Sequence, residues 1–437
     1  MHIKETVNVE AKFRRYKSGD EEGIVELIKT CFKTFNSWKL STIDWIGYEE
    51  DDDGFTKENA LIAEVDGKII GHIQLMHRRI RIGRSIIDCG GIANVSTHPK
   101  YRMRGVATKL MQMALEVCQA KRWPISSLLT GYGSDGYRVY RKIGYANTTF
   151  IYEYIGTCEN VDNTLKTLRR YVKRVNEMGE KDLNVVMKIH DEYSKNISGY
   201  CQRSEKYWKK KIMEKTYYHS FFHEEKDAGI RIVTEDNEVN GYALSFNTLK
   251  ASRSQWMDNL GLVMEIAAIK REDLYNLLNG ILNRMRREGV KIFRLRIPGH
   301  EELNEPLRHF EIMKGAIYMD YIVNQRRLFE AMKEELEERI TKNCGEIDYE
   351  ISIGSPYGCT KLEVSGGKIN VMEGKTRNHI ELTSDGITKL VYGVKGFKEI
   401  LDERKDIVRI EADSEALKIF EVIFPKRIFQ ISPIDEW

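Results

Sequence analysis

The stretch of sequence that decides the fold is Arg102-Met103-Arg104-Gly105-Val106-Ala107. It follows a small, apolar run at residues 90–95 that is typical of a strand, and it opens a segment with helical spacing. The first turn of a helix presents backbone N–H groups without intrahelical partners, together with the positive end of the helix dipole. A pyrophosphate group can bind at such a turn, and Gly105 lets the backbone approach its oxygens because no Cβ intervenes.

The segments around this stretch predict a mixed α/β unit. Apolar residues share one side of the segment that begins at Val106, which predicts a helix ending near Trp123-Pro124. Upstream, two apolar runs around Asp66-Gly67 predict a β-hairpin. Residues 78–87 predict one further strand, and the acidic residues 49–53 predict a loop. Downstream, the pattern predicts a strand at 127–130, a short helix at 137–142 and a closing strand at 150–154.

Length and composition predict a multidomain, cytoplasmic protein. A chain of 437 residues exceeds the usual size of one hydrophobic core, so we expect two or three domains. A net charge of +3 gives no indication of a nucleic-acid partner. The seven cysteines form no CxxC pair and no metal-ligand spacing, which favours reduced thiols and no bound metal. We find neither a signal peptide nor an apolar run of the roughly 18 to 20 residues that a membrane helix needs.

The middle third of the chain repeats the first third without the phosphate-binding stretch. Asp236 and Gly241 follow Asp66 and Gly71 by 170 positions each, and residues 265–269 resemble residues 91–95. The last hundred residues alternate short strands with helices, including a charged helix predicted at 328–340, and indicate a small α+β domain. We therefore expect domains at 1–157, 158–327 and 328–437 in an α+β or mixed α/β fold.

Three motifs resemble the acetyl-coenzyme A signature of the GNAT (Gcn5-related) N-acetyltransferases: Val95-Ser96-Thr97-His98-Pro99, the stretch from Arg102 to Ala107, and Tyr140-Arg141-Lys142-Ile143-Gly144-Tyr145. The whole layout, with Phe424-Pro425-x-Arg427 and Asp435-Glu436-Trp437 near its end, is similar to the enhanced-intracellular-survival (Eis-type) acetyltransferases. This resemblance implies a catalytic GNAT domain at 1–157, a degenerate GNAT-like domain at 158–327 and a sterol-carrier-protein-like domain at 328–437.

The resemblance also implies a binding site for acetyl-CoA and no metal. The strand at 95–97 would bind the pantetheine arm through its backbone, residues 103–108 would bind the pyrophosphate, and residues 134–135 would flank the coenzyme. The predicted cofactor-binding residues are Val95, Ser96, Thr97, Arg102, Met103, Arg104, Gly105, Val106, Ala107, Thr108, Ser134 and Asp135.

Direct acetyl transfer to an amine needs a base and an acid, because an amine with a pKa of about 10.4 is mostly charged at neutral pH. A phenol, with a reference pKa of about 10, suits the protonation of the departing thiolate. The resemblance assigns this acid to Tyr140; Tyr137, one turn earlier, is the alternative, and Tyr140 could instead only pack against the coenzyme. No histidine is singled out as base. The resemblance implies the C-terminal carboxylate of Trp437, against the alternative of a frayed terminus.

The resemblance implies a small-molecule acceptor, a polyamine or an aminoglycoside-like compound. We predict Trp38, Asp44 and Glu436 as substrate-binding residues, with Asp435 and the acidic residues 49–53 as further candidates. Residues 49–53 could equally form a solvated loop. Two other functions stay open: acetylation of protein or peptide lysines, and a scaffold that binds an apolar ligand through its last domain. The resemblance further implies a homo-oligomer, a hexamer.

Overall fold

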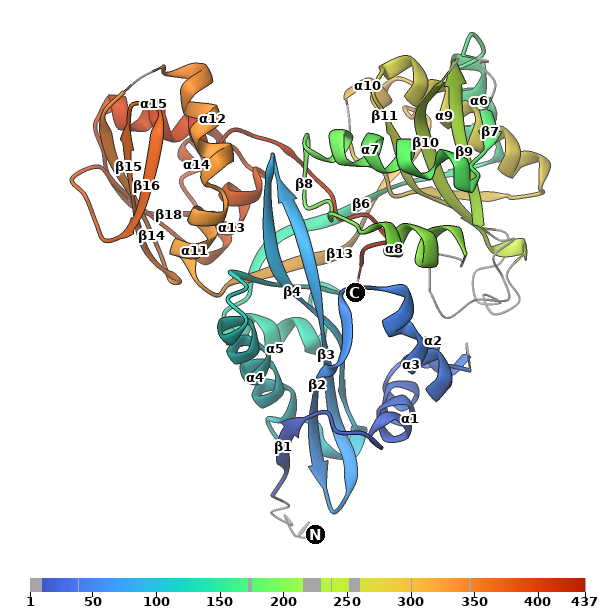
Figure 1. Ribbon diagram of the computed structural model, residues 1–437, viewed down its shortest axis with the longest axis horizontal. Coiled ribbons are helices and arrows are strands. Elements are labelled where there is room, and N and C mark those ends of the chain that lie inside the picture. Colours follow the sequence, from blue (N-terminus) through green and yellow to red (C-terminus); the bar gives the residue numbers. More distant parts are fainter. Residues whose placement is uncertain are drawn as a thin grey trace.

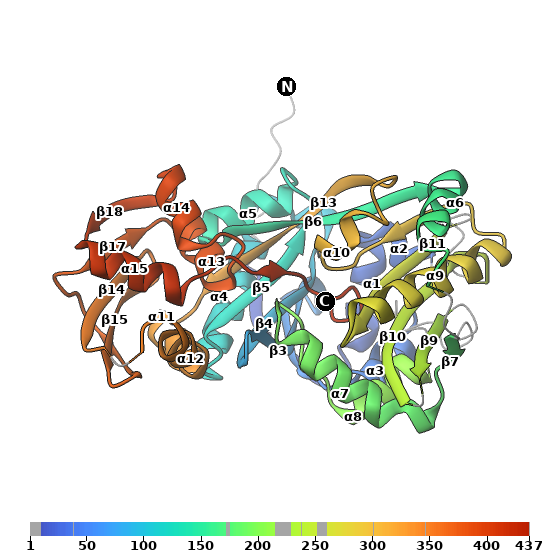
Figure 2. The same ribbon diagram turned by 90° about the horizontal axis from the view of Figure 1, so that it is seen from above.

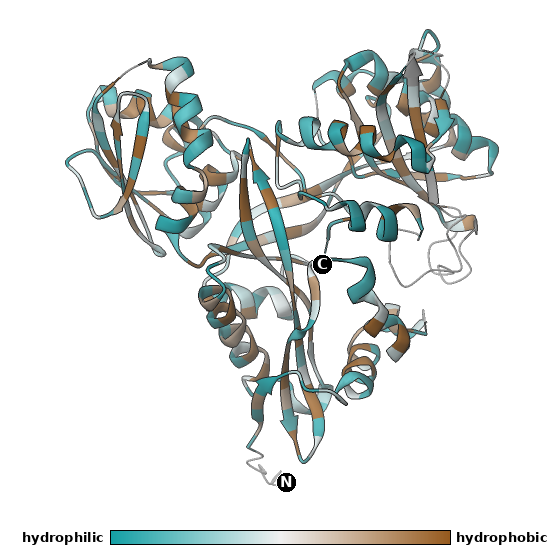
Figure 3. Cartoon of the chain, in the orientation of Figure 1, coloured by the Kyte–Doolittle hydropathy of each residue, from teal (hydrophilic) through white to brown (hydrophobic). Residues whose placement is uncertain are grey.

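The computed structural model describes residues 10–37, 39–171, 175–214, 229–236, 238–250, 260–299, 301–345 and 347–436. The elements gather in three lobes, and the C-terminal segment reaches the middle of the molecule (Figure 1). Hydrophobic residues concentrate on the strands, whereas the outward helices carry most of the hydrophilic ones (Figure 3). Among the described residues, no helix is both long enough and apolar enough to cross a lipid bilayer.

The N-terminal lobe is a sheet covered by helices on both faces (Figure 1). Its strands are β1 (Lys12–Arg15), β2 (Phe55–Val65), β3 (Lys68–Ile82), β4 (Ser85–Thr97) and β5 (Ile125–Thr130). Its helices are α1 (Glu21–Cys31), α2 (Lys33–Ser37), α3 (Thr42–Asp51), α4 (Val106–Ala120) and α5 (Asp135–Ile143). Successive side chains of a strand point to opposite faces, so Leu61 and Ala63 pack with α4 whereas Ala60 and Ile62 pack with α1 and α3.

The structure confirms the predicted hairpin and corrects two of its neighbours. Asp66 and Gly67 form the β2–β3 turn with φ of 48° and 74°, the left-handed conformation that such turns require. The single strand predicted at 78–87 was wrong, because Gly83, with φ of 63°, reverses the chain between β3 and β4. The loop predicted at 49–53 was wrong for its first three residues. Helix α3, which begins with a capping box at Ser41, extends through them.

The middle lobe shows the same order of strand pairings as the N-terminal lobe. Strands β9 (Gly229–Asp236) and β10 (Glu238–Asn247) are antiparallel, as are β10 and β11 (Leu260–Ala268), and β11 is parallel to β12 (Ile292–Leu295). Helix α9 (Arg271–Arg287) connects β11 to β12 as α4 connects β4 to β5. The other elements are α6 (Cys158–Thr167), β7 (Val175–Glu177), α7 (Leu183–Ser194), β8 (Ile197–Ser198), α8 (Glu205–Tyr207), a π-helical turn (Trp208–Met213) and α10 (Glu301–Asn304).

The two lobes exchange strands. Strand β6 (Ala146–Thr157) pairs with β12 of the middle lobe, while β13 (Glu311–Ile322) lies between β5 and β6. Both strands run side by side across the molecule (Figures 1 and 2). Within the described part of the chain, 12 strands therefore form one sheet in the order β1-β2-β3-β4-β5-β13-β6-β12-β11-β10-β9-β7.

The C-terminal lobe has a separate five-stranded sheet within its described residues, in the order β16-β15-β14-β17-β18. The strands are β14 (Tyr349–Ser355), β15 (Gly358–Ser365), β16 (Lys368–Glu373), β17 (His379–Leu382) and β18 (Ile407–Glu411). The helices are α11 (Gln325–Ala331), α12 (Lys333–Asn343), α13 (Ser384–Tyr392), α14 (Phe397–Glu403) and α15 (Ser414–Ile423). The helix predicted at 328–340 is thus two helices. After α15 the chain returns to the centre, where β19 (Ile428–Phe429) pairs in parallel with β8.

Gly71 and Gly241 occupy corresponding places where a helix lies close against the sheet. A Cβ at Gly71 would lie 2.7 Å from Val106 Cγ1 and 2.9 Å from Leu110 Cδ1, both on α4. A Cβ at Gly241 would lie 2.9 Å from Leu277 Cδ1 on α9. Both positions thus exclude a side chain, which explains the glycine spacing seen in the sequence.

We expect Gly71→Ala to lower the free energy of unfolding by about 1–3 kcal/mol, because overpacking forces the helix away from the sheet. Gly47→Ala is the control: its Cβ would meet no atom within 4 Å, and alanine in the middle of α3 should stabilise by about 0.5–1 kcal/mol. Urea unfolding measures both changes. Equal stability of Gly71→Ala and the native protein would show that the helix can move without cost.

Candidate active site

Strands β4 and β5 separate toward their carboxyl ends. They pair in parallel only at residues 89–91 with 125–127, although both strands continue, to Thr97 and Thr130. A β-bulge contributes, because Ile73 of β3 faces both Asn94 and Val95, and Asn94 has φ of 52°. The peptide groups on the facing edges of the two strands are therefore open to a ligand that carries amide groups, as the pantetheine arm does.

A cavity of about 530 Å³ lies where these strands separate. Asn94, Val95, Leu129 and Thr130 border it on the strand side. Aromatic side chains of α2, α3 and β2, and of Phe32 just after α1, border it on the opposite side. Three residues of the C-terminal segment complete the lining: Pro433, Ile434 and Glu436. Residues from both ends of the chain thus meet at one cavity.

The turn before α4 contains a glycine in the left-handed backbone conformation. Gly105 caps α4 with φ of 80°, and α4 starts at Val106, so the amides of its first turn face outward. A Cβ at Gly105 would meet no atom within 4 Å, so glycine is favoured here by its backbone conformation and not by crowding. Arg102 donates from Nε to the carbonyl of Thr97 at 3.3 Å, which holds its guanidinium group beside the end of β4.

The other predicted cofactor residues lie around this turn and strand, although only Val95 of the predicted set lines the cavity. Ser96 is buried and bonds the carbonyl of Asn94. Ser134 caps α5 by accepting from the amide of Tyr137 at 3.1 Å, and Asp135 pairs with Arg138 on the surface. The remaining residues, Met103, Arg104, Ala107 and Thr108, are at least partly exposed around the start of α4.

Tyr140 lines the cavity, whereas Tyr137 does not. Burial raises the pKa of the Tyr140 phenol to about 12, so it stays protonated at neutral pH. A Cβ at Gly136 would lie 3.4 Å from the Tyr140 hydroxyl, so the glycine leaves room beside that oxygen. The Tyr137 hydroxyl instead accepts a hydrogen bond from Asn147 Nδ2 at 3.1 Å. Of the two tyrosines, Tyr140 is therefore the one that borders the cavity.

The C-terminal segment is held by a buried ion pair. Arg203 contacts both oxygens of the Asp435 carboxylate at 2.8 Å and both oxygens of Glu265 at 2.7 and 2.9 Å. Arg78 donates to the Asp435 backbone carbonyl at 3.1 Å, and the Tyr207 hydroxyl lies 2.8 Å from the Ile434 carbonyl. Asp435 thus holds the chain in place beside the cavity.

A second carboxylate, Asp52, completes this network. It accepts from Arg78 at 2.7 and 2.9 Å and from Lys211 Nζ at 2.8 Å. Burial alone would raise the pKa of Asp52, but Arg78 and Lys211 hold it well below its usual value. Three cations and three carboxylates balance in the network: Arg78, Arg203, Lys211, Asp52, Glu265 and Asp435.

Glu436 belongs to a neighbouring group of charges. Arg296 binds its carboxylate through both terminal nitrogens, and the Tyr318 hydroxyl donates to it at 2.7 Å. Arg296 also contacts Glu153 at 3.1 Å. Glu436, one of the three predicted substrate-binding residues, lines the cavity. Its negative charge is already paired with the positive charge of Arg296.

The other predicted site residues lie elsewhere. Asp44 does not line the cavity; its carboxylate accepts from the Ser41 amide at 2.9 Å and from the Ser41 hydroxyl at 2.6 Å. None of the acidic residues 49–53 lines the cavity. Trp38 and Trp437 lie outside the described residues. In the part of the chain that the structure describes, no group of His, Cys, Asp and Glu has an arrangement that could hold a metal ion.

Sequence reasoning did not find the cations of these two groups of charges. Arg203 is 232 positions from Asp435, Lys211 is 159 from Asp52 and Arg296 is 140 from Glu436, and the local sequences of the three cations carry no motif. Arg78 gave no signal of its own either, because Arg79 and Arg81 lie in the same strand.

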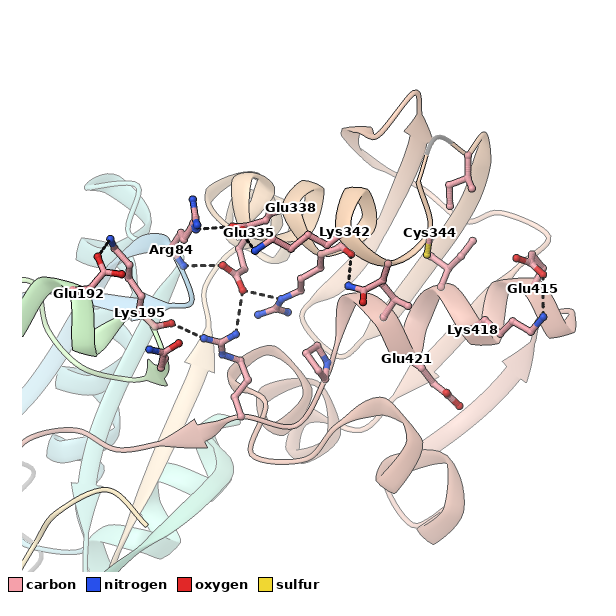
Figure 4. Close-up of a pocket in the computed structure, with 18 residues that line it drawn as sticks. Arg84, Glu192, Lys195, Glu335, Glu338, Lys342, Cys344, Glu415, Lys418 and Glu421 are labelled. Atoms are coloured by element: carbon pink, nitrogen blue, oxygen red, sulfur yellow. Dashed lines mark hydrogen bonds and ion pairs between the residues drawn. The ribbon is translucent and has the colours of Figure 1, made fainter. Parts of the chain in front are cut away.

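A larger cavity, of about 980 Å³, lies between the middle and C-terminal lobes (Figure 4). Its charged side chains largely pair with one another. Glu335 accepts from the Arg84 amide at 2.8 Å, from Arg339 Nε at 2.9 Å and from Arg427 Nη1 at 3.2 Å. Arg427 also donates to the Lys195 carbonyl at 2.6 Å. These contacts join the lobes, so the charges here serve the assembly of the fold.

Comparisons with known proteins agree with the site. Residues 12–148 match the sequence profile of the acetyltransferase (GNAT) domain, while a search of curated proteins finds no match. A GCN5-related N-acetyltransferase from Anabaena variabilis has a TM-score of 0.70 at 15% identity, over 98% of this chain and 100% of that one. A GCN5-related N-acetyltransferase from Kribbella flavida has a TM-score of 0.69 at 15% sequence identity, and the match covers 99% of each chain. Eis1 from Mycobacterium abscessus has a TM-score of 0.62 at 13% sequence identity, and the match covers 98% of this chain and 100% of that one.

At such identities the likeness to solved structures concerns the fold, which extends over nearly the whole chain. The profile match shows that residues 12–148 form an acetyltransferase domain of the GNAT class. The protein is therefore an acyltransferase enzyme, with acetyl-CoA as its cosubstrate.

We expect Gly105→Ala to raise the KM for acetyl-CoA roughly tenfold, because alanine in the left-handed conformation costs about 1–2 kcal/mol and will relax away from it. Gly67→Ala is the matched control, because Gly67 also has a positive φ, of 74°, and a Cβ there would meet no atom within 4 Å. This variant should lose a similar amount of folding stability with no change in the KM for acetyl-CoA. Steady-state kinetics with varied acetyl-CoA measures the difference, and equal KM values for the two variants would argue against phosphate binding at this turn.

Proposed function

We propose that the protein transfers the acetyl group of acetyl-CoA to a primary amine by direct attack, with Tyr140 as general acid and the C-terminal carboxylate of Trp437 as general base. The observation that carries this proposal is the shared cavity. It is lined at once by the open edges of β4 and β5, by Tyr140, and by Pro433, Ile434 and Glu436.

In the proposed reaction, the neutral amine nitrogen attacks the thioester carbonyl carbon. A C–N bond forms, the C–S bond breaks, and the products are an N-substituted acetamide and the thiol of coenzyme A. Tyr140 gives its proton to the departing sulfur. Its raised pKa keeps it protonated at neutral pH, so that proton is present when the thiolate forms.

The base that we propose lies one residue beyond the described C-terminal segment. Asp435 and Glu436 are both anchored by arginines, which supports delivery of the next residue to the same cavity. A free carboxylate, with a reference pKa of about 3.3 to 3.7, is a weak base. It would act through a bound water or through desolvation, which raises its pKa.

The wider organisation belongs to the same proposal. We propose a catalytic GNAT domain at 1–157, a degenerate GNAT-like domain at 158–327 and a sterol-carrier-protein-like domain at 328–437. The repeated order of strand pairings supports the GNAT-like domain at 158–327. At the start of α9 the capping residue is Lys270 with φ of −114°, in place of a left-handed glycine, which supports the proposal that this domain does not bind coenzyme. The exchanged strands β6 and β13 mean that these domains share one sheet. The predicted hexamer stays a prediction.

The class of the acceptor follows from the resemblance alone. The resemblance implies a polyamine or an aminoglycoside-like compound, and lysine side chains of proteins are the enzymatic alternative. The predicted acidic surface at 49–53 gives no support to a polycation, because Asp52 is buried and paired and none of the five residues lines the cavity. A scaffold that only binds an apolar ligand would show no turnover.

We expect Tyr140→Phe to lower kcat by roughly 10²- to 10⁴-fold, the usual contribution of a general acid, with little change in the Kd for acetyl-CoA. Free-thiol release in a panel of primary amines measures turnover, and calorimetry measures coenzyme binding. Tyr137→Phe is the matched control in the same helix and should retain most activity. The reverse order of the two variants would transfer the acid role to Tyr137. Coenzyme binding without turnover for any amine would favour the scaffold.

Deleting Trp437, or extending the chain beyond it, should reduce kcat by a similar factor, because either change moves the terminal carboxylate. Trp437→Ala keeps the carboxylate in place and should lose much less. The same thiol assay compares the three proteins at one pH. Full activity in the extended protein would rule out the terminal carboxylate as base.

A further inference from the structure

The acceptor side of the cavity is apolar. Beyond Tyr140 and the open strand edges, it is bordered by the side chains of Phe32, Phe35, Trp45, Tyr48, Phe55 and Met76. Several of these rings pack edge to face: Trp45 with Phe55 at 5.4 Å between centroids, and Tyr48 with Phe55 at 5.3 Å. A substrate that enters this side therefore meets mainly ring edges and a thioether, and the neutral Gln74 amide and Trp45 indole nitrogen are polar groups of the same lining.

The charges around the cavity leave little for a cation to pair with. Among the described residues that line it, Glu436 carries the only carboxylate, and Arg296 and Tyr318 already bind it. The other two charged lining residues, Lys211 and Arg296, are cations. Lys211 is buried, lies 2.8 Å from Asp52 and sits over the Tyr48 ring at 5.5 Å, so a further cation at that ring would meet its repulsion.

These charges affect one ammonium group and several ammonium groups differently. A single amine must lose its proton to react, and burial in a cavity whose charges are already paired lowers the pKa of an amine, which favours the neutral nucleophile. The terminal carboxylate that we propose as base takes that proton. Each additional ammonium group would enter without a counterion and would have to stay hydrated or lose its own proton.

We propose that the acceptor is a primary monoamine that carries an apolar or aromatic group, and that the ring-lined side of the cavity selects it against polyamines. This inference rests on the proposed function and narrows its acceptor. The reaction consumes acetyl-CoA and the neutral amine and gives the N-alkylacetamide and the coenzyme A thiol, so no other reactant is needed.

Matched amines test the inference. Butylamine and 1,4-diaminobutane differ by one ammonium group; 2-phenylethylamine adds a ring, and spermidine is the polycation. We expect kcat/KM for butylamine to exceed that for 1,4-diaminobutane by between about tenfold and a thousandfold, the latter being the cost of removing a proton from an amine of pKa about 10.4 near neutral pH. We expect 2-phenylethylamine to be the best of the four acceptors and spermidine the poorest. Equal or higher values for 1,4-diaminobutane and spermidine would overturn the inference.

A pair of variants tests the role of the cavity lining. Phe35→Glu places a carboxylate on the apolar side and should shift the ratio of diamine to monoamine kcat/KM at least about tenfold toward the diamine. Ile43→Glu places the same charge on α3, where the side chain of Ile43 is 82% exposed, and should leave the ratio unchanged. The same shift in both variants, or in neither, would show that the lining does not select the acceptor.

Binding separates this inference from the proposed function. Calorimetric titration of the four amines into the protein saturated with coenzyme A should give the same order of affinities as catalysis. That order in binding, together with no thiol release from acetyl-CoA, would reject the proposed function and keep the selectivity. Tighter binding of the diamine and spermidine would reject the selectivity, even if all four amines were acetylated.

Discussion

The bidentate contact between Arg203 and Asp435 is the interaction on which the site depends. It joins a residue of the middle lobe to the C-terminal segment and places that segment against the N-terminal lobe. Removing two charges from water is costly, and such a pair is tolerated only where further hydrogen bonds satisfy it. Here Glu265, Tyr207 and Arg78 provide them. Because loss of one partner would leave a buried charge, the segment has one favoured position.

The balance of the network explains why the carboxylates of Asp52 and Asp435 do not face the cavity. The side chain of Asp52 pairs with Arg78 and Lys211, and Asp435 pairs with Arg203. The carboxylates that the sequence offers to a cationic substrate are therefore used to hold the protein together. What remains around the cavity is mainly aromatic surface, together with Tyr140.

The parts of the fold that the sequence predicts well depend on local rules. The Asp66-Gly67 hairpin and helix α4 each follow from turn and periodicity preferences within about fifteen residues. The position of Tyr140 follows from the Gly144 stop of α5, which has φ of 111°.

The parts that the sequence does not predict depend on distant partners. Asp52 and Lys211 are 159 positions apart, and Asp435 and Arg203 are 232 apart, so no local pattern connects them. The acidic residues 49–53 have the pattern of a solvated loop, because the cations that pair with Asp52 lie in distant parts of the sequence. Likewise, the sequence at 311–322 indicates a strand, but the sequence pattern does not indicate that this strand lies between β5 and β6.

The exchange of β6 and β13 has a consequence for biosynthesis. When the ribosome has made residue 157, β5 still lacks its neighbour, and that neighbour is completed only at residue 322. For more than 160 residues of synthesis the nascent chain therefore presents an open strand edge, which other chains could add to. Pairings of such long sequence separation also form slowly. The protein accordingly cannot mature lobe by lobe from its N-terminus, and its demand for chaperone protection should be greatest while the middle lobe is being made.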